Sequence, residues 1–339
     1  MSRRPLAIVI RLSALGDVLL AGPAIQRIAL DHDVLLVTDP PYAALAAALP
    51  GVSEVRALDH REGVAGVHRL GVELRASHPS RVFDLQAKVR TRLLAHTIGA
   101  TIRTLGRRTA PEALGAILGH DRILQEEHQA RRYLRVMEDE PAPPVRLGPL
   151  ALHADWVSAA DQIARAAGWQ PEERAVAVAP SATHATKGWP VARYAELVRR
   201  IADLATPILI VAGPNDAAAV STFRTALGPR PRVVDSSAVP LTTLAALLAR
   251  SRILVGNDSG PIHLASALDV PTVAVFGPTS VRRWGPLPGT EARHRVARLD
   301  LACSPCSNHG DERCPLGHHD CLEKLDVDTV VHELEAVAA

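Results

Sequence analysis

Residues 256–263, GNDSGPIH, combine glycine, short polar side chains and an imidazole between an apolar run and a helical pattern. The apolar run at 253–255 predicts a strand, and Asp258 or Ser259 is the expected N-cap of the helix that follows. Open amides in a first helical turn attract anions, and His263 could donate to the same anion. The segment therefore predicts a phosphate or diphosphate site, although an ordinary capped turn with a solvated histidine fits the same residues equally well.

Lysine is scarce in this chain, which makes its positions informative. Among 38 lysine and arginine residues, the lysines are Lys88, Lys187 and Lys324. Lys187 lies in the polar stretch 180–190, and a compact ammonium binds phosphate as a point charge where arginine presents a planar fork. We therefore expect Lys187 at an anion site, with an ordinary surface lysine as the alternative.

The turn after the first apolar run, residues 11–17 with the sequence RLSALGD, contains a single glycine. A dinucleotide-binding oxidoreductase would have G-x-G-x-x-G there, and a P-loop NTPase would have a glycine-rich loop followed by lysine. Both classes are therefore disfavoured. The turn instead offers Asp17, a carboxylate that could act as a base or serve as a first-turn acid favoured by the helix dipole.

All four cysteines lie within 19 positions, at Cys303, Cys306, Cys314 and Cys321. In a cytoplasmic protein such clustering favours thiolate ligands over disulfides, and four sulfurs could hold a tetrahedral structural zinc. The irregular spacing favours reduced structural thiols instead, so both interpretations stay open.

The elements that must position these residues alternate between strands and helices. The first half predicts strands at 6–10, 34–38 and 81–85, a turn at 13–17 and a helix at 18–30. The second half predicts strands at 175–179, 207–212, 233–235, 253–255 and after Pro271, and helices at 155–167, 194–204, 241–249 and 262–268. Such alternation indicates parallel sheets with right-handed crossovers and a ligand at the carboxyl ends of the strands.

A break in this pattern divides the chain. Residues 138–149, EDEPAPPVRLGP, combine acids with four prolines and have no apolar periodicity, which is typical of a linker. We therefore predict an α/β protein with two Rossmann-like domains whose parallel sheets face across a cleft. The first domain is expected at 1–145 and the second at 146–339.

Composition and charge limit the class of protein. No apolar run in the 339 residues reaches the roughly 20 that a bilayer requires, and Arg11 and Asp17 interrupt the N-terminal apolar run too early for a signal peptide. We therefore expect a cytoplasmic protein. Nucleic-acid binding is disfavoured because aromatic residues, at 3%, do not interleave with the basic ones.

Positive charge is concentrated between residues 81 and 108. Seven basic residues against one acid, Asp84, give a local charge of +6: Arg81, Lys88, Arg90, Arg92, Arg103, Arg107 and Arg108. This segment could receive an anionic substrate or an acidic membrane surface, and a solvated helix face is the alternative.

Four segments, taken in order, resemble glycosyltransferase family 9, the family of the ADP-heptose:lipopolysaccharide heptosyltransferases. They are IVIRLSALGDVLLAGPAIQRI, DLQAKVRTRLLA, PSATHATKGWPVARYAELV and GNDSGPIHLASALDVPTVAVFGPTSVRRWGP. The resemblance implies the GT-B architecture, with ADP-heptose held by the C-terminal domain and a lipid-linked anionic acceptor sugar, Kdo or heptose, held by the N-terminal one. It also implies peripheral contact with the inner membrane.

The resemblance also implies roles for individual residues in an inverting, single-displacement transfer. Asp17 matches the catalytic base, and Lys187 matches the lysine that contacts the donor phosphate. Further donor contacts implied by motif position are Thr183, Asp216, Asp258, Ser259, Gly260 and His263, and the acceptor contacts are Ser13, Gln86 and Arg90. No D-x-D metal motif stands before a glycine-rich loop, so no cofactor is expected to be required.

This chain departs from the family pattern at Ser181, where many relatives have glycine. Two alternative functions share the architecture. A sugar-nucleotide epimerase would turn over the donor alone, and a non-catalytic sugar-nucleotide sensor would have no use for the acid at position 17.

Overall fold

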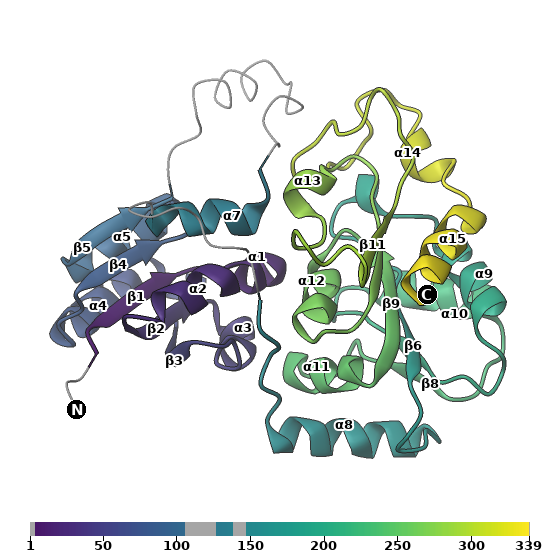
Figure 1. Ribbon diagram of the computed structural model, residues 1–339, viewed down its shortest axis with the longest axis horizontal. Coiled ribbons are helices and arrows are strands. Elements are labelled where there is room, and N and C mark those ends of the chain that lie inside the picture. The colour runs from purple at the N-terminus through teal and green to yellow at the C-terminus, as the bar shows by residue number, and fades with distance from the viewer. Residues whose placement is uncertain (1–3, 106–126, 138–146, 339) are drawn as a thin grey trace. The chain divides into compact units, whose positions relative to one another are not determined.

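The computed structural model describes residues 4–105, 127–137 and 147–338, which divide into two compact units (Figure 1). The N-terminal unit comprises residues 1–107 and 129–151, and the C-terminal unit comprises 108–128 and 152–339. Each unit has its own parallel sheet. The boundary predicted after residue 145 lies outside the described residues and stays a prediction.

The N-terminal unit is built on five parallel strands in the order β3-β2-β1-β4-β5. They are β1 (Leu6–Ile10), β2 (Asp33–Thr38), β3 (Val52–Ala57), β4 (Arg81–Asp84) and β5 (Thr101–Thr104). The helices are α1 (Leu15–Leu20), α2 (Gly22–Ile28), α3 (Pro40–Ala46), α4 (Gly63–Ala76), α5 (Val89–Ile98) and α7 (Gln129–Leu134), with single turns of 3-10 helix at His60–Glu62 and Arg135–Met137.

The core of this unit lies between the sheet and the packed pair of helices α4 and α5. Ile8 and Ile10 of the central strand, fully buried, pack with Val82 of β4 against Leu74 and Leu94 of the helices. Strand order reverses at β1, where the chain steps first to β2 and later to β4 on its other side. In a doubly wound sheet the carboxyl ends of the strands at such a reversal form the usual binding edge.

The C-terminal unit has six parallel strands in the order β11-β10-β9-β6-β7-β8. They are β6 (Ala175–Ala179), β7 (Ile208–Ile210), β8 (Val233–Asp235), β9 (Ser251–Asn257), β10 (Thr272–Val275) and β11 (His294–Ala297). The helices are α8 (Ala154–Ala166), α9 (Val191–Ile201), α10 (Ala217–Leu227), α11 (Leu241–Ala249), α12 (Gly260–Ala267), α13 (Val281–Trp284), α14 (Asp320–Glu323) and α15 (Val327–Ala338), and Ala185–Lys187 forms a turn of 3-10 helix.

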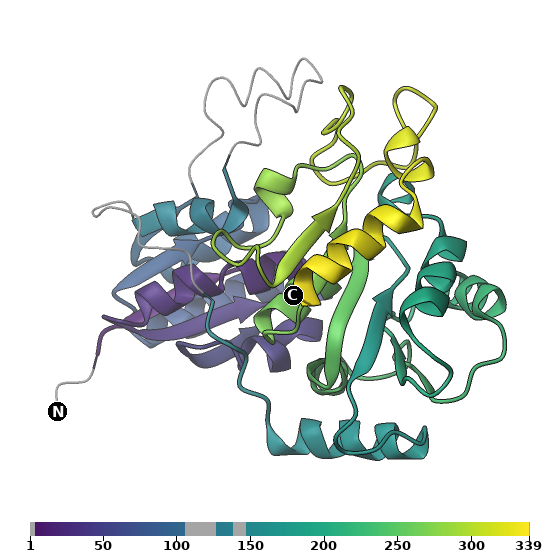
Figure 2. The same ribbon diagram turned by 45° about the vertical axis from the view of Figure 1, so that its right-hand side comes forward.

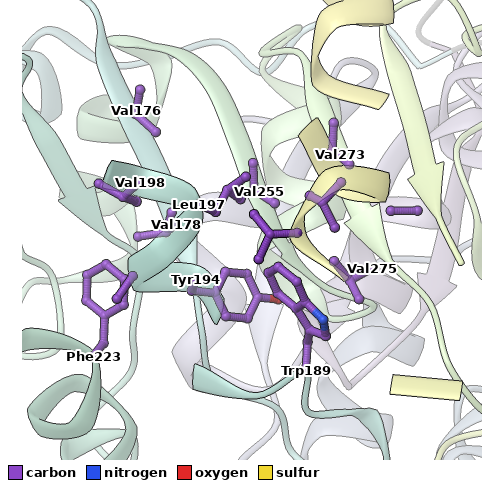
Figure 3. Close-up of a cluster of buried hydrophobic side chains, with 14 of the residues drawn as sticks. Val176, Val178, Trp189, Tyr194, Leu197, Val198, Phe223, Val255, Val273 and Val275 are labelled. Atoms are coloured by element: carbon purple, nitrogen blue, oxygen red, sulfur yellow. The ribbon is translucent and has the colours of Figure 1, made fainter. Parts of the chain in front are cut away.

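One face of this second sheet is covered by α9, α10 and α15, which the turned view in Figure 2 brings forward. Valines of the strands, such as Val178 and Val255, pack there against Trp189, Tyr194 and Phe223 (Figure 3). The Trp189 and Tyr194 rings meet edge to face with centroids 4.8 Å apart. Because this layer fixes the start of α9, it also fixes the loop that precedes it.

Most predicted elements are confirmed, and the differences have local causes. The helix predicted at 18–30 is two short helices, α1 and α2, because Pro23 near the start of α2 has no N–H to continue the first one. The helical part also begins earlier than predicted, at Leu15, so Asp17 lies in the first turn of α1 and not in a loop. The helix predicted at 194–204 begins earlier, at Val191, directly after Pro190, and ends at Ile201. Strands β3, β5 and β11 were not predicted.

No helix among the described residues is both long enough and apolar enough to cross a bilayer.

Candidate functional site

Asp17 is held by two partners within the N-terminal unit. Its Oδ2 lies 2.7 Å from Nη2 of Arg11, and its Oδ1 accepts a hydrogen bond of 2.6 Å from the Tyr133 hydroxyl. The Asp17 side chain is 17% exposed. Each carboxylate oxygen retains a second acceptor position, so the group stays able to accept a proton from a substrate hydroxyl.

Tyr133, on α7, was not predicted as a site residue. Burial, reinforced by the neighbouring Asp17 charge, raises the pKa of Tyr133, which keeps its hydroxyl a donor. The Arg11 guanidinium lies 5.3 Å from the Tyr133 ring centroid and also donates to the Leu85 carbonyl at 3.0 Å. Arg11 and Tyr133 therefore fix the direction in which the Asp17 carboxylate points.

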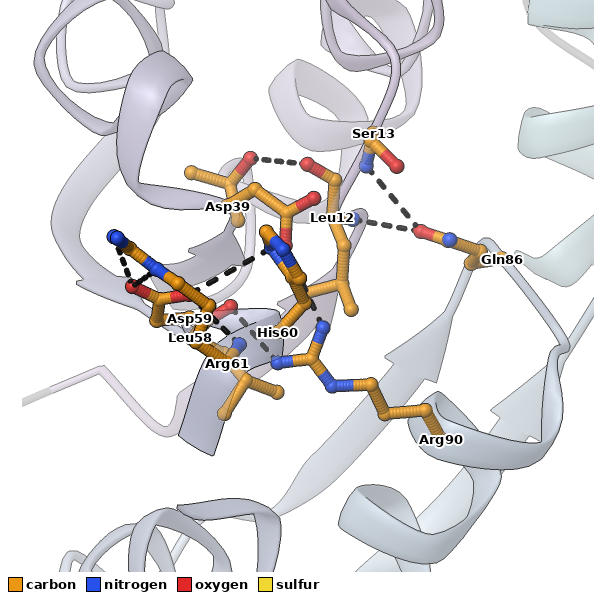
Figure 4. Close-up of polar contacts among 10 residues, drawn as sticks. Leu12, Ser13, Asp39, Leu58, Asp59, His60, Arg61, Gln86 and Arg90 are labelled. Carbon is orange, nitrogen blue, oxygen red and sulfur yellow. Dashed lines mark hydrogen bonds and ion pairs between the residues drawn. The ribbon is translucent and has the colours of Figure 1, made fainter. Parts of the chain in front are cut away.

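The predicted acceptor residues Ser13, Gln86 and Arg90 follow the carboxyl ends of β1 and β4 (Figure 4). The Gln86 side-chain oxygen accepts from the Leu12 N–H at 2.8 Å and from the Ser13 N–H at 3.4 Å. Arg90 donates to the Leu58 carbonyl at 3.0 Å. Gln86 thus brings two of these residues together, whereas Arg90 is engaged with the chain after β3.

Asp39 joins this group and was missed by the sequence prediction. Burial raises the pKa of Asp39, an effect that the nearby Arg90 charge and a hydrogen bond with Ser13 partly offset. Its Oδ1 lies 3.8 Å from Arg90 and has no hydrogen-bond partner among the described residues. The sequence signal was available, because an acid directly follows the apolar run of β2.

In the C-terminal unit, Lys187 and the buried Asp258 form an ion pair. Lys187 Nζ lies 2.8 Å from Asp258 Oδ2, and the two side chains are 15% and 6% exposed. The Thr279 hydroxyl, which was not predicted, donates to the same Oδ2 at 2.7 Å. Asp258 is therefore the counter-ion that holds the ammonium in place, and it is not the N-cap of α12.

Ser259 is the N-cap residue of α12, but its side chain caps no amide. Its hydroxyl donates instead to the Asn257 carbonyl at 3.0 Å. Gly260 opens the helix, Pro261 has no N–H, and His263 is buried one turn in, with 8% of its surface exposed. The start of α12 thus carries the positive end of the helix dipole beside the Lys187 ammonium.

The two remaining donor candidates lie on neighbouring strand ends. Thr183 is exposed on the same loop as Lys187, after β6. Asp216 follows β7, the next strand of the sheet, and its Oδ2 accepts from the Gly213 N–H at 2.6 Å. All predicted donor residues therefore follow the carboxyl ends of the adjacent strands β9, β6 and β7.

Asn257 links several segments at this edge of the sheet, and the sequence prediction missed it as well. Its side-chain oxygen accepts from the Trp189 N–H and the Tyr194 hydroxyl, both at 2.9 Å. Its side-chain amide donates to the carbonyls of Ser181 at 3.1 Å and Pro180 at 3.3 Å. One fully buried side chain thus fastens both ends of the loop that carries Lys187.

The four cysteines are reduced and lie in different surroundings. Burial, with the nearby Cys306, Cys303 and Cys314, raises the pKa of Cys321 to about 11. Burial also acts to raise the pKa of Cys314, but backbone N–H groups of residues 316–319 outweigh it and lower that pKa. Within the described part of the chain, which includes every cysteine, no group of three His, Cys, Asp or Glu side chains is arranged to hold a metal ion. The zinc hypothesis stays a prediction.

Several known proteins are similar to this chain. The family model described as Glycosyltransferase family 9 (heptosyltransferase) matches residues 67–316. Lipooligosaccharide heptosyltransferase 2 of Campylobacter jejuni (serotype O:6) is 35% identical over 98 residues, which are 29% of this chain and 29% of that protein. The chain thus aligns with about three tenths of that relative's length.

Two solved structures share the fold over nearly the whole chain. A glycosyl transferase family 9 protein from Veillonella parvula matches with a TM-score of 0.82 and 20% identity, covering 99% of this chain and 98% of that one. The E. coli heptosyltransferase WaaC, solved with ADP-2-deoxy-2-fluoro heptose, matches with a TM-score of 0.68 and 19% identity, covering 97% and 99%. The predicted fold class, two α/β domains of the GT-B type, is confirmed.

Proposed function

Because the chain belongs to glycosyltransferase family 9, we propose that it transfers a heptose from ADP-heptose to a sugar of the lipopolysaccharide inner core, either Kdo or heptose. The observation that carries the proposal is the Lys187–Asp258 pair beside the uncapped start of α12. An ammonium and a helix N-terminus at one strand edge are suited to a diphosphate. The WaaC complex with an ADP-heptose analogue supports the choice of donor.

The proposed reaction is a single displacement that inverts the anomeric carbon. Asp17 takes the proton of the acceptor hydroxyl while that oxygen bonds to the anomeric carbon of the heptose. The bond from this carbon to the diphosphate oxygen breaks, and ADP leaves with its electron pair. Lys187 and the start of α12 stabilise the charge that grows on the diphosphate, so we propose that no metal ion is required.

For the acceptor we propose a lipid-linked anionic sugar presented at the surface of the inner membrane. Support comes from the start of α5, where the N-cap residue Lys88 and the helical Arg92 are exposed beside the exposed apolar residues Val89 and Leu93. Basic and apolar side chains together favour an anionic lipid surface. Arg107 and Arg108, also part of the predicted basic segment, lie outside the described residues.

Calorimetric titration with ADP, UDP and GDP tests the donor assignment. We expect ADP to bind most tightly and Lys187→Ala to weaken ADP binding by about tenfold or more, since hydrogen bonds to charged groups contribute roughly 1.5–3 kcal/mol. Lys324→Ala is the matched control, because this lysine is 67% exposed and pairs only with Asp320 among the described residues. A preference for UDP would contradict the ADP-heptose proposal.

Asp17→Asn tests the proposed base with little change in shape, because an amide oxygen can still accept from Tyr133. We expect transfer to an acceptor to be abolished while ADP affinity stays that of the wild type. Transfer at the wild-type rate would show that another group removes the proton. Turnover of ADP-heptose without any acceptor would favour the epimerase alternative.

A further inference from the structure

The segment between the first and last cysteines, residues 303–321, takes no part in the reaction proposed above, yet it folds against the loop that carries Lys187. We call residues 303–321 the cysteine-rich segment. It contacts three residues of this loop, which are His184, Thr186 and Lys187.

Thr186 is the main polar link between the loop and the cysteine-rich segment. Its N–H donates to the Asp311 carbonyl at 3.1 Å, and its hydroxyl donates to the same carbonyl at 2.8 Å. The Asp311 N–H donates back to the Thr186 hydroxyl at 2.7 Å, and His319 Nε2 lies 2.8 Å from the Thr186 carbonyl oxygen. With 5% of its surface exposed, Thr186 is locked in place directly before Lys187.

Gly310 makes the direct contact with the lysine side chain. Its φ is +88°, and a Cβ at this position would lie 2.6 Å from Lys187 Cγ, 2.7 Å from Cδ and 3.0 Å from the Cβ of His184. The aliphatic stem of Lys187 therefore lies across a residue that has no side chain. Any larger residue would displace the stem, and with it the ammonium.

The other end of the segment is attached beside Thr279, the residue that holds Asp258. The N–H groups of Cys306 and Ser307 both donate to the Pro278 carbonyl, at 2.8 and 3.0 Å. The Ser304 hydroxyl donates to the Gly277 carbonyl at 2.6 Å. The cysteine-rich segment thus contacts the chain directly before Lys187 and directly before Thr279, the residue whose hydroxyl donates to Asp258.

From these contacts we propose that the cysteine-rich segment positions Lys187 for the donor diphosphate, with Gly310 and Thr186 as the positioning residues. Gly310 sets the path of the lysine stem, and Thr186 fixes the backbone from which the stem departs. The proposal rests on the role given above to Lys187. It assigns the segment a function that requires neither a metal nor a disulfide.

Paired substitutions test the proposal through ADP affinity measured by calorimetry and through kcat and KM for the donor. Thr186→Val removes the hydroxyl that donates to the Asp311 carbonyl and accepts from the Asp311 N–H, whereas Thr186→Ser retains it. We expect about tenfold weaker ADP binding for Thr186→Val and wild-type affinity for Thr186→Ser. Gly310→Ala should weaken ADP binding by about tenfold as well.

Gly317→Ala is the matched control for Gly310→Ala. Gly317 lies in the same segment with φ +78°, but a Cβ there would meet nothing within 4 Å. This control carries a similar backbone strain without displacing Lys187, so its ADP affinity should stay within about twofold of the wild type. If Gly310→Ala does not fold, the test rests on the comparison of Thr186→Val with Thr186→Ser.

A double-substitution experiment separates positioning from general destabilisation. In a Lys187→Ala background, Thr186→Val should cause no further loss of ADP affinity, because the residue acts through the missing ammonium. If Thr186→Val weakens ADP binding further in the Lys187→Ala background, the proposal is overturned. It is also overturned if Thr186→Val alone binds ADP with wild-type affinity while Lys187→Ala binds it about tenfold more weakly. If Lys187→Ala itself binds ADP normally, it is the donor assignment that fails.

Discussion

The Tyr133 hydroxyl is one of two groups that orient the Asp17 carboxylate, and its removal should affect turnover more than binding. Tyr133→Phe keeps the ring in the core and the contact with Arg11 but deletes the 2.6 Å hydrogen bond. A hydrogen bond to an ionised group contributes roughly 1.5–3 kcal/mol, so we expect kcat to fall by about tenfold or more. Steady-state kinetics with saturating donor and acceptor measure this.

The affinity of the Tyr133→Phe variant for ADP should equal that of the wild type, since Tyr133 belongs to the N-terminal unit and the proposed donor residues belong to the other. Tyr42→Phe is the control, because it removes another tyrosine hydroxyl of the same unit, one that bonds the Leu15 backbone. Unchanged kcat in Tyr133→Phe would mean that Arg11 alone is enough to orient the carboxylate.

Residue type explains which site residues could be found from the sequence. Lys187 stands out because lysine is rare here, and Asp17 because it follows a buried strand in a matching motif. Their partners do not stand out. Tyr133 is 116 positions from Asp17, and Asn257 is 68 positions from Trp189. Such pairs become visible only when the fold brings distant segments together, since a buried tyrosine or asparagine has no periodic signature of its own.

Among the secondary-structure elements, strands surrounded by others were predictable and three edge strands were not. The central strands β1 and β6 are continuous apolar runs because they are buried on both faces. The edge strands β3, β5 and β11 mix apolar with polar residues, as in the sequence VSEVRA of β3, so no continuous apolar run appears. Their existence follows from the sheet order and not from their own composition.

We expect acid to destabilise the folded chain through His294, on the edge strand β11. Burial, helped by the neighbouring Arg293 charge, lowers the pKa of His294 from 6.5 to about 4. Between these two values the unfolded chain binds a proton that the folded chain does not, so stability should fall as the pH drops through this window. The shift corresponds to about 3 kcal/mol lost between pH 7 and pH 4.

Urea unfolding at several pH values measures this loss, with His294→Gln as the comparison. Glutamine cannot titrate, so the free energy of unfolding of the variant should depend on pH less steeply than that of the wild type, by about 3 kcal/mol over the same range. Parallel pH profiles for the two proteins would show that His294 titrates alike in the folded and unfolded states.

At the scale of the whole molecule, the two units have separate sheets and separate cores, which is why their alternating strands and helices sufficed to predict the fold class. The units also differ in a useful way. All four tryptophans of the chain, Trp156, Trp169, Trp189 and Trp284, belong to the C-terminal unit. Tryptophan fluorescence therefore reports the unfolding of that unit, whereas far-ultraviolet circular dichroism reports both.

ADP should consequently shift one unfolding transition and not the other. If ADP binds only to residues of the C-terminal unit, a concentration of about 100 times Kd stabilises that unit by about 2.7 kcal/mol. The urea midpoint seen by fluorescence should rise, while the dichroism curve should separate into a shifted and an unshifted step because independent domains need not unfold together. Lys187→Ala should reduce the fluorescence shift, and Asp17→Asn should leave it unchanged. If ADP shifts the fluorescence and the dichroism curves equally, the assignment of the nucleotide to the C-terminal unit alone is contradicted. Stabilisation would then extend to the N-terminal unit, which holds none of the proposed donor residues.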